Sequence, residues 1–525
     1  MSERPRATTT GDLVAELAAT RPNDVGLVCG DVRLTWSDLA ASVARLAAGW
    51  WSLGIRSGDR IAMLGANCAE WILTDLAASS IGAVFMGLNT WYPAQDLRYV
   101  LKHSGARVVV TAAELFGRPL LPLVRGVVDE CPDVEHLVVI GEHGPQDIDF
   151  AELAATSPAV SAVQEVPGPG DPAAILYTSG STAHPKGVVL HHGDLVANGW
   201  EIGERQHLRP GDRLWLGIPL FFSFGSANAL FAALTHGVAL IVQERFDASI
   251  AVDLIERERC TVYYGMSHMT RALLDERARR GVALDSLRTG LTIGPPAAIA
   301  MTADLVPGIC NIYGLTETYG NCSVTDADEP LALRAESHGR LLPGFEALVL
   351  DPATGAPLPP GETGALLIRG RVTSGYFRDP ERSAEAFARP GWFDTGDLGS
   401  VDADGRLRYA GRAKEMLKVG GINVSPVSVE EVLLGFPGVR QAHVVGVRDP
   451  ERGELPVAVV EWAAGADPDA GGLLAHCRAR LPSYAVPVDY RSWSDDRLPR
   501  TGTGKVRRAE LTALVEKERS CESST

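Results

Sequence analysis

The sequence lacks long apolar runs and paired cysteines. No window approaches the roughly 18 consecutive apolar residues that a membrane-spanning helix needs, and the N-terminal stretch MSERPRATTT has no apolar core after its arginines. The eight cysteines are spaced singly, with no C-x-x-C pair that would indicate a zinc or redox centre. We therefore expect a cytoplasmic protein with no membrane partner, in which the thiols stay reduced.

The sequence has no excess of positive charge, and its histidines do not show the spacing that is typical of metal ligands. The net charge is −16 at pH 7 and the pI is about 5.3, which argues against binding of nucleic acid or an anionic membrane over a broad surface. The 12 histidines include no H-E-x-x-H or similar spacing, so no transition-metal site is expected. Any phosphate group must therefore be bound by a local site.

What is present is the composition of an ordinary globular protein with alternating strands and helices. Hydrophobic residues make up 46% and charged residues 22% of the 525 residues, which argues against a disordered or fibrous chain. Strand-like apolar runs lie at Arg60–Leu64, Ala106–Thr111, His136–Ile140 and Ala173–Tyr177. Helical patterns lie between them or before them, at Leu13–Ala19, Leu39–Leu53 and Pro93–His103. This alternation predicts a doubly wound, mostly parallel α/β sheet, and its recurrence over 237–293 predicts a second one.

The pattern of apolar and turn-forming residues changes after about residue 330. Short apolar runs separated by Pro, Gly and Asp predict antiparallel hairpins, which we interpret as a β-barrel-like subdomain. From residue 413 the pattern is that of a compact α+β unit. The predicted organisation is an N-terminal domain over 1–412, with two α/β subdomains to about 325 and a β-rich subdomain over about 326–412, and a small C-terminal domain over 413–525.

The most informative segment is the loop from Tyr177 to Gly187, YTSGSTAHPKG, which lies between two apolar strands. Glycine lets a loop fold around an anion, while hydroxyl side chains and backbone N–H groups supply donors without bulk. Lys186 adds a charge, so the loop is suited to phosphates. It is not a Walker A loop, because Pro185 and Gly187 stand where that motif needs a glycine and a hydroxyl. Taken alone, it could equally be an ordinary surface turn.

Further motifs follow in order along the chain. They are Tyr313-Gly314-Leu315-Thr316-Glu317, Asp394-Thr395-Gly396-Asp397, Gly411-Arg412-Ala413-Lys414, and Leu498-Pro499-Arg500-Thr501-Gly502-Thr503-Gly504-Lys505. With the loop, they resemble the motifs of the adenylate-forming superfamily of acyl-CoA synthetases, luciferases and peptide-synthetase adenylation domains. The resemblance runs from about residue 10 to 515. It implies an enzyme that activates a carboxylic acid as its adenylate with ATP and Mg²⁺, releases pyrophosphate, and passes the acyl group to the thiol of coenzyme A.

The resemblance also implies a role for each motif in binding ATP. The loop residues that would surround the β- and γ-phosphates are Thr178, Ser179, Gly180, Ser181, Thr182 and Lys186. Glu317 would hold Mg²⁺, Thr316 the α-phosphate, and Tyr313 would pack against adenine, beside a loop that contains Gly294 and Pro295. Asp397 and Arg412 would bind the ribose, and Lys505 would bridge the forming adenylate and the carboxylate. A metal and fixed donors suit this chemistry, because negative charge builds up as the carboxylate attacks the α-phosphorus.

The second half-reaction is assigned to the C-terminal domain, which the resemblance describes as mobile. Lys414 falls at the hinge position, about which the small domain reorients after adenylation. Lys418, Gly420 and Gly421 would then line the path of the thiol, since paired glycines allow a close backbone approach to the pantetheine arm.

The sequence departs from the family pattern in the predicted acid pocket. Phe222 stands where many acyl-CoA synthetases have a histidine, and Ala183 replaces a glycine of the phosphate loop. The other positions that match pocket residues are Phe224, Asn228, Met266, Ser267, His268, Ile312, Thr318 and Tyr319. Bulky aromatics shorten such a pocket, so a small or aromatic acid is expected to fit better than a long fatty chain.

Alternatives remain open at this point. A carrier protein could replace coenzyme A as the partner, or the enzyme could be an ATP-dependent diazotase that activates nitrite and couples it to an aromatic amine. A non-catalytic nucleotide-binding module is disfavoured by the presence of both Glu317 and Lys505. The oligomeric state cannot be predicted from these patterns.

Overall fold

The computed structural model describes residues 3–157, 166–178, 184–420, 422–449, 452–463, 465–500 and 506–522. The chain divides into two compact units. Unit 1 comprises Met1–Gly294, Ala298–Glu346 and Ile368–Phe393, and unit 2 comprises Pro295–Ala297, Ala347–Leu367 and Asp394–Thr525. The prediction of a large N-terminal and a small C-terminal part in a mixed α/β fold is confirmed. The domain boundary at 412/413 stays a prediction; by contacts, residues 394–412 group with unit 2.

The first sheet of unit 1 has seven strands, in the order β11-β10-β4-β3-β5-β8-β9. Their bounds are β3 (Arg60–Leu64), β4 (Val84–Gly87), β5 (Val108–Ala112), β8 (His136–Ile140), β9 (Ile148–Asp149), β10 (Pro172–Thr178) and β11 (Lys186–His191). All neighbouring pairs are parallel except the β10–β11 hairpin. A separate two-stranded sheet joins β6 (Glu114–Leu115) to β7 (Arg118–Pro119).

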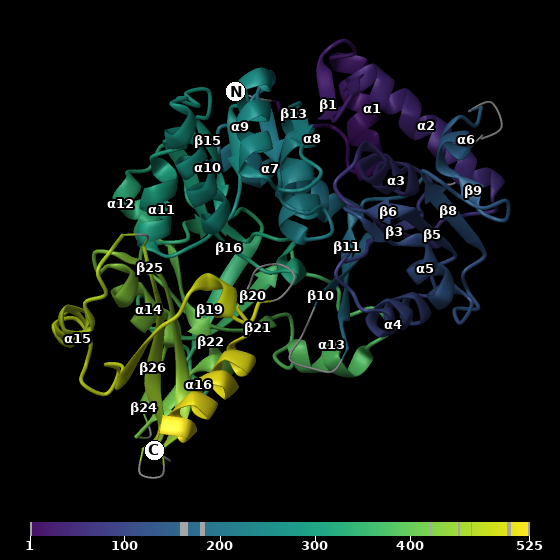
Figure 1. The fold of residues 1–525 in the computed structure, drawn as a ribbon. Helices are drawn as coiled ribbons and strands as arrows, with labels where there is room; N and C mark the ends of the chain where they lie inside the picture. Colours follow the sequence, from purple (N-terminus) through teal and green to yellow (C-terminus); the bar gives the residue numbers. More distant parts are fainter. Residues whose placement is uncertain are drawn as a thin grey trace. The chain divides into compact units, whose positions relative to one another are not determined.

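Helices cover both faces of this sheet. Side chains of α4 (Ala94–Ser104) and α5 (Leu121–Val128) share one buried cluster with Ala62 and Leu64 of β3. On the opposite face, Trp71 of α3 (Ala69–Ser80) packs edge-on against Phe85 of β4, with ring centroids 4.7 Å apart. Figure 1 shows α3 on one side of β3 and β5, and α4 and α5 on the other. Because successive side chains of a strand face opposite ways, this is the doubly wound arrangement that the sequence predicted.

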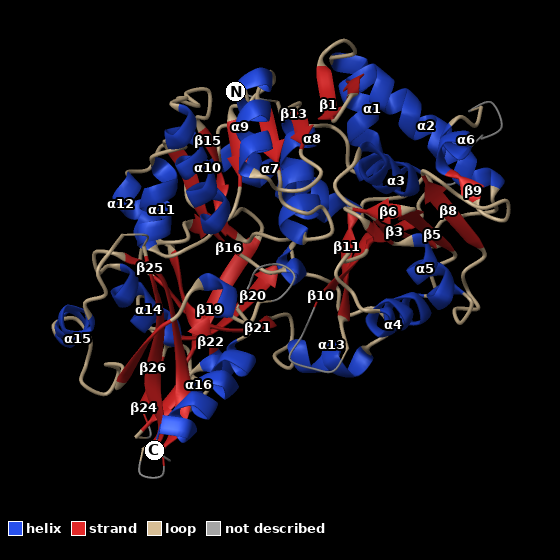
Figure 2. Ribbon diagram, in the orientation of Figure 1, coloured by secondary structure: helices blue, strands red, loops and turns tan. Residues whose placement is uncertain are grey.

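The second sheet of unit 1 has nine strands, in the order β18-β17-β16-β15-β14-β12-β13-β1-β2. Their bounds are β1 (Val25–Cys29), β2 (Val32–Thr35), β12 (Arg213–Leu216), β13 (Ala239–Val242), β14 (Val262–Tyr264), β15 (Thr289–Thr292), β16 (Gly308–Tyr313), β17 (Ser323–Val324) and β18 (Arg340–Leu341). The run from β16 to β1 is parallel, as predicted for the second α/β layer. The N-terminal hairpin β1–β2 completes its edge, with Leu27 paired to Leu240. Figure 2 shows helices beside the strands of both sheets.

The other helical elements of unit 1 connect these strands. They are α1 (Thr10–Thr20), α2 (Trp36–Ser52), α6 (Phe150–Ala154), α7 (His192–Arg205), the π-helix η2 (Phe224–Leu230), α8 (Phe231–His236), α9 (Ala248–Glu258), α10 (Ser267–Arg280), α11 (Pro296–Ala303, whose first residues group with unit 2), the 3₁₀ turn η3 (Thr316–Thr318), α12 (Leu331–Glu336) and α13 (Pro380–Ala386). The helix α2 begins at a capping box, in which Thr35 and Asp38 bond each other's backbone N–H. None of the described helices combines the length and the apolar content that a bilayer crossing requires.

The β-rich segment forms a four-stranded sheet in the order β19-β20-β21-β22. Its strands are β19 (Phe345–Leu350), β20 (Gly364–Gly370), β21 (Phe393–Val401) and β22 (Leu407–Arg412). The predicted hairpin between β21 and β22 is present, and the Asp402 carboxylate accepts from the backbone N–H groups of Asp404 and Arg406 in its turn.

The C-terminal segment is the predicted α+β unit, a five-stranded sheet with helices on both faces. The strands are β23 (Leu417–Val419), β24 (Ile422–Val424), β25 (Val439–Asp449), β26 (Gly453–Trp462) and β27 (Asp489–Ser492). The helical elements are η4 (Ala413–Glu415), α14 (Pro426–Leu434), α15 (Ala470–Arg478), η5 (Asp495–Arg497) and α16 (Arg508–Glu522). Side chains of α14 and α15 bury one face of β25 and β26, and those of α16 bury the other.

A buried acid in α3 leads to a first testable prediction. Asp75 is 5% exposed, and burial raises its pKa from its ordinary value of 3.8 to about 7. Since the folded-state pKa is the higher one, the stability that this group contributes is present below about pH 4 and is lost as pH rises through 7. Asp75→Asn should therefore raise the free energy of unfolding at pH 8 by about 1–4 kcal/mol and have little effect at pH 4. Denaturant melts of both proteins at the two pH values would measure this, and an equal effect at both would contradict it.

Candidate active site

The centre of the candidate site is a short turn that follows strand β16. Parallel strands present ligand-binding loops at their carboxyl ends, and η3, which carries Thr316 and Glu317, begins just beyond that end of β16. The hydroxyl of Thr318 closes the turn, accepting from the Leu315 N–H at 2.9 Å and donating to the Leu315 carbonyl at 3.0 Å. The predicted motif is thus a rigid turn with its carboxylate, Glu317, 8% exposed.

Tyr319 directly follows this turn and is held in place by several hydrogen bonds. Its backbone is left-handed, with φ 57°, a conformation that costs free energy for a non-glycine residue and persists only where neighbours enforce it. Its carbonyl accepts from the side-chain amides of Asn198 at 3.1 Å and Asn228 at 2.9 Å, and its hydroxyl lies 3.0 Å from Nδ1 of His191. Tyr319 is fully buried by these contacts. Its role in lining the acid pocket, and that of Thr318, stay predictions.

Two side chains from distant parts of the sequence meet Glu317. The Tyr376 hydroxyl donates to Oε1 of Glu317 at 2.9 Å and accepts from Nζ of Lys186 at 3.0 Å. Nζ lies 3.8 Å from the same Oε1 and 4.3 Å from the centroid of the Tyr376 ring. The sequence motifs predict Lys186 and Glu317 but not Tyr376, because a tyrosine 59 residues beyond Glu317 carries no local chemical signal.

The predicted phosphate loop is closed by the hairpin from which Lys186 comes. Strands β10 and β11 pair up to the register Thr178↔Lys186, so the two ends of the loop lie opposite each other. The remaining predicted phosphate-binding residues, Ser179, Gly180, Ser181 and Thr182, lie outside the described residues.

The segment with Phe222 lies against Thr316. The hydroxyl of Ser223 is 3.1 Å from that of Thr316, which places the preceding phenylalanines beside the turn. The rings of Phe221 and Phe222 are 4.5 Å apart, and Trp91 packs against both, at 5.2 and 5.9 Å. An apolar aromatic cluster therefore surrounds Phe222 beside this turn. Of these residues, Phe222 could be predicted from the sequence, whereas Trp91 and Ser223 could not.

The other predicted pocket residues come from elements that follow parallel strands of the nine-stranded sheet. Phe224 and Asn228 lie on η2, a π-helix, which is an uncommon element that often marks functional sites. The Phe224 ring lies 5.4 Å from that of Tyr264, at the end of β14. Met266, Ser267 and His268 begin α10, and Ile312 is buried on β16. Gly294, predicted to lie on the adenine side, is closely packed, since a Cβ there would lie 2.9 Å from Cβ of Ala298 and 3.3 Å from Oγ of Ser267; its role stays a prediction. Tyr313 packs edge-on against His338 at 6.4 Å.

The predicted ribose-binding residues pair with each other within unit 2. Asp397 and Arg412 face each other across the β21–β22 hairpin, with Nε of the arginine 2.9 Å from Oδ1 of the aspartate. Thr395 orders the turn, since its hydroxyl donates to the Leu366 carbonyl at 2.6 Å and accepts from the Asp397 N–H at 3.1 Å. Asp397 is 2% exposed, so this is a fixed acceptor suited to ribose hydroxyls.

The hinge and thiol-access residues follow in sequence. Lys414 lies in η4, directly after β22, and Lys418 lies on β23 with its side chain exposed. Gly420 has φ 58°, the left-handed conformation that favours glycine. Gly421 and Lys505 lie outside the described residues. Pro295, the other adenine-side residue, precedes α11 in the part of the chain that groups with unit 2.

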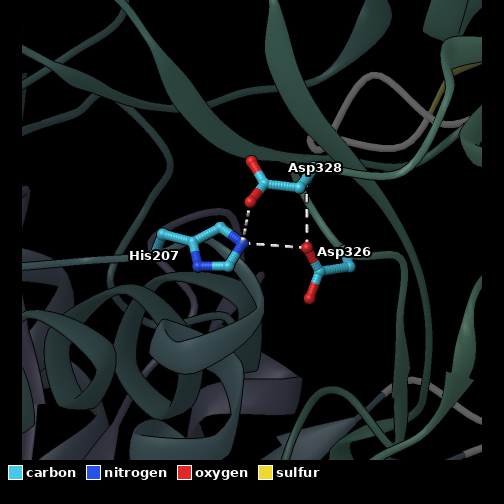
Figure 3. Close-up of side chains that lie close together, drawn as sticks. All are labelled: His207, Asp326 and Asp328. Carbon is cyan, nitrogen blue, oxygen red and sulfur yellow. Dashed lines mark hydrogen bonds and ion pairs between the residues drawn. The ribbon is translucent and has the colours of Figure 1, made fainter. Parts of the chain in front are cut away.

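A further cluster on the surface of unit 1 has the residue types of a metal site. Figure 3 shows the His207 imidazole between the carboxylates of Asp326 and Asp328, with Nε2 at 2.8 Å from Asp326 Oδ1 and 3.4 Å from Asp328 Oδ2. No sequence pattern predicts this cluster, since His207 lies about 120 positions before the two aspartates. Arg205 also lies 3.9 Å from Asp326, and the Asp326 carboxylate accepts from the Asp328 N–H. We interpret the cluster as an exposed ion-pair network and assign no metal to it.

Comparisons with known proteins agree with this geometry. Residues 14–377 match the family model of the AMP-binding enzyme, and residues 428–505 match that of the AMP-binding enzyme C-terminal domain. The chain is 34% identical to feruloyl-CoA synthase of Amycolatopsis sp, covering 94% of this chain and 96% of that protein. It is 28% identical to the mitochondrial medium-chain acyl-CoA ligase ACSF2 of Mus musculus, covering 97% and 88%. A crystal structure of the anthranilate CoA ligase AuaEII with anthranoyl-AMP superposes with a TM-score of 0.87 at 27% identity, covering 98% and 99%.

The chain therefore belongs to the family of AMP-binding enzymes, the adenylate-forming superfamily that its motifs resemble. The predicted class of enzyme is confirmed: it is an AMP-forming ligase that uses ATP to activate a carboxylic acid and coenzyme A to accept it. None of the relatives named above is a diazotase, and that alternative is not supported.

Proposed function

We propose that the enzyme prefers an aromatic carboxylic acid and forms its CoA thioester. The observation that carries this proposal is the aromatic cluster of Trp91, Phe221 and Phe222 beside Thr316. Flat rings pack well against edge-on and tilted aromatic neighbours, while bulky walls leave little length for an extended chain. The relatives include both aryl and medium-chain acyl ligases, so they support the reaction more strongly than the choice of acid.

The residues of the described site have roles that fit the first half-reaction. An oxygen of the substrate carboxylate attacks the α-phosphorus of ATP, and pyrophosphate leaves. In this proposal Thr316 contacts the α-phosphate, Thr178 and Lys186 bind the outer phosphates together with Ser179–Thr182, and Lys505 spans the acid and the adenylate. Asp397 and Arg412 hold the ribose, and Tyr313 packs on the adenine.

Glu317 fits the requirements of a Mg²⁺ ligand. Its Oε1 accepts from Tyr376, while in the described part of the chain no hydrogen bond reaches Oε2. A hard cation prefers such a carboxylate oxygen. When bound there, the ion would neutralise charge that develops on the phosphates.

The second half-reaction needs the C-terminal unit. The sulfur of coenzyme A attacks the acyl carbonyl, and AMP leaves. We propose that Lys414 serves as the hinge for this step and that Lys418, Gly420 and Gly421 line the path of the thiol. A carrier protein would present the same pantetheine thiol, so it is the alternative acceptor that the test must distinguish.

The test is pyrophosphate release over a panel of acids, followed by addition of coenzyme A. We expect kcat/KM for benzoate- and cinnamate-type acids to exceed that for octanoate and decanoate by about 10-fold or more, the scale of a few apolar contacts. Trp91→Ala should reduce this preference, whereas Phe116→Ala, which removes another exposed aromatic side chain of unit 1, should not. A preference for decanoate would overturn the proposed acid, and adenylate that coenzyme A never consumes would favour the carrier protein.

A further inference from the structure

Tyr376 lies where three otherwise separate segments converge. It is 8% exposed, and its hydroxyl stands between the ammonium of Lys186, at 3.0 Å, and Oε1 of Glu317, at 2.9 Å. The direct contact between the lysine and the carboxylate is longer, at 3.8 Å. The phenol thus converts a loose ion pair into a chain of two hydrogen bonds to charged groups, which are the stronger kind.

The direction of this chain is fixed by the chemistry of its members. An ammonium can only donate, and a carboxylate can only accept, so the phenol must accept from Lys186 and donate to Glu317. The phenol proton therefore lies on the hydrogen bond to Oε1 of Glu317.

The backbone on either side of Tyr376 is held by the same partners. The N–H of Thr373 donates to the Glu317 carbonyl at 2.7 Å, and its hydroxyl donates to the Val189 carbonyl on β11 at 2.8 Å. On the other side, the N–H of Phe377 donates to the Gly187 carbonyl at 2.8 Å. Residues 373–377 thus join the turn that carries Glu317 to the strand that carries Lys186, and Tyr376 is fixed relative to both.

We propose that Tyr376 is a positioning residue that orients Glu317 for the metal ion. By occupying Oε1, it turns Oε2 toward the ion, and by accepting from Lys186 it keeps the ammonium from taking that oxygen. The inference rests on the proposed role of Glu317 as the Mg²⁺ ligand and extends it to a residue that makes no contact with the metal.

The experiment measures the Mg²⁺ dependence of ATP binding by calorimetry in wild type, Tyr376→Phe, Glu317→Gln and the double variant. Phenylalanine keeps the ring over Lys186 and removes only the hydroxyl. We expect Tyr376→Phe to raise the half-saturating Mg²⁺ concentration by about 10-fold, the scale of one hydrogen bond to a charged group. Because the tyrosine acts through the carboxylate, the same change in the Glu317→Gln background should have less than about a third of that effect.

Tyr263→Phe is the matched control. It also removes one hydroxyl from a buried tyrosine of unit 1, bonded to Thr270 at 3.0 Å, and it belongs to none of the nucleotide motifs. It should lower thermal stability without moving the Mg²⁺ titration. A shift confined to the Tyr376 variant, and lost with Glu317→Gln, supports the inference.

Two outcomes overturn it. One is an unchanged Mg²⁺ titration in Tyr376→Phe, and the other is a shift of the same size with and without Glu317. Failure of the proposed function gives a different result, since wild type would then release no pyrophosphate with any aromatic acid although its binding of ATP still responded to Mg²⁺.

Discussion

Glu317→Gln is expected to slow acyl-adenylate formation by about 10²–10³-fold, the loss that follows removal of one charged partner of the transition state. The amide keeps the shape of the side chain, so the turn that Thr318 closes should stay intact. What is lost is the negative charge that a hard cation prefers, and the reaction should also need more Mg²⁺. Single-turnover formation of acyl-AMP at several Mg²⁺ concentrations measures both effects.

The matched control for this substitution is Glu336→Gln, on an exposed position of α12. It removes the same charge from unit 1 and should leave the rate and the Mg²⁺ dependence unchanged. If Glu317→Gln behaved like this control, Glu317 would have no role in binding the metal.

Lys505→Ala is expected to lose adenylation by a similar factor while keeping the second half-reaction. In the proposed function the Lys505 ammonium bridges the carboxylate and the α-phosphate, and it stabilises charge only while the adenylate forms. Thioester formation from chemically prepared acyl-AMP should then proceed at nearly the wild-type rate. The rate of adenylation and the rate of thioester formation, measured separately by chromatography, test whether Lys505 acts in the first half-reaction alone.

Lys517→Ala is the matched control, because it removes one positive charge from the C-terminal helix α16 and leaves Lys505 in place. Both half-reactions should be normal in that variant. Equal impairment of both half-reactions in Lys505→Ala would instead indicate that the residue stabilises the C-terminal unit.

Elements that depend on local pattern could be predicted from the sequence. Strands β3 and β8 begin and end at the predicted residues, since each is a continuous apolar run between turn signals. The hairpin of β1 and β2 could not be assigned to its sheet, because nothing local to residues 25–35 indicates pairing with β13. Tertiary contacts alone decide which parallel strand lies beside another.

The candidate site likewise contains residues that could be predicted from the sequence and residues that could not. The phosphate loop and the Thr316–Glu317 turn are contiguous in sequence, and their composition indicates what they bind. Tyr376 and Ser223 acquire their significance only from what the fold places beside them, a carboxylate 59 residues away and a hydroxyl 93 residues away. The role of a tyrosine in a Gly-Tyr-Phe stretch cannot be predicted until the side chains that the fold places beside it are known.

The pairing of β1 with β13 also has a consequence for how the chain folds as it is made. The two strands are about 210 residues apart, so β1 leaves the ribosome about 10–40 s before its partner at ordinary rates of synthesis. During that interval its apolar residues, Leu27 and Val28, which end fully buried, have no partner strand on which to form the parallel ladder. Long-range parallel pairing is slow and leaves strand edges open to other chains. Strand β1 therefore waits longer for its parallel neighbour than any other described strand of the nine-stranded sheet, and the N-terminal hairpin should depend on chaperones during synthesis.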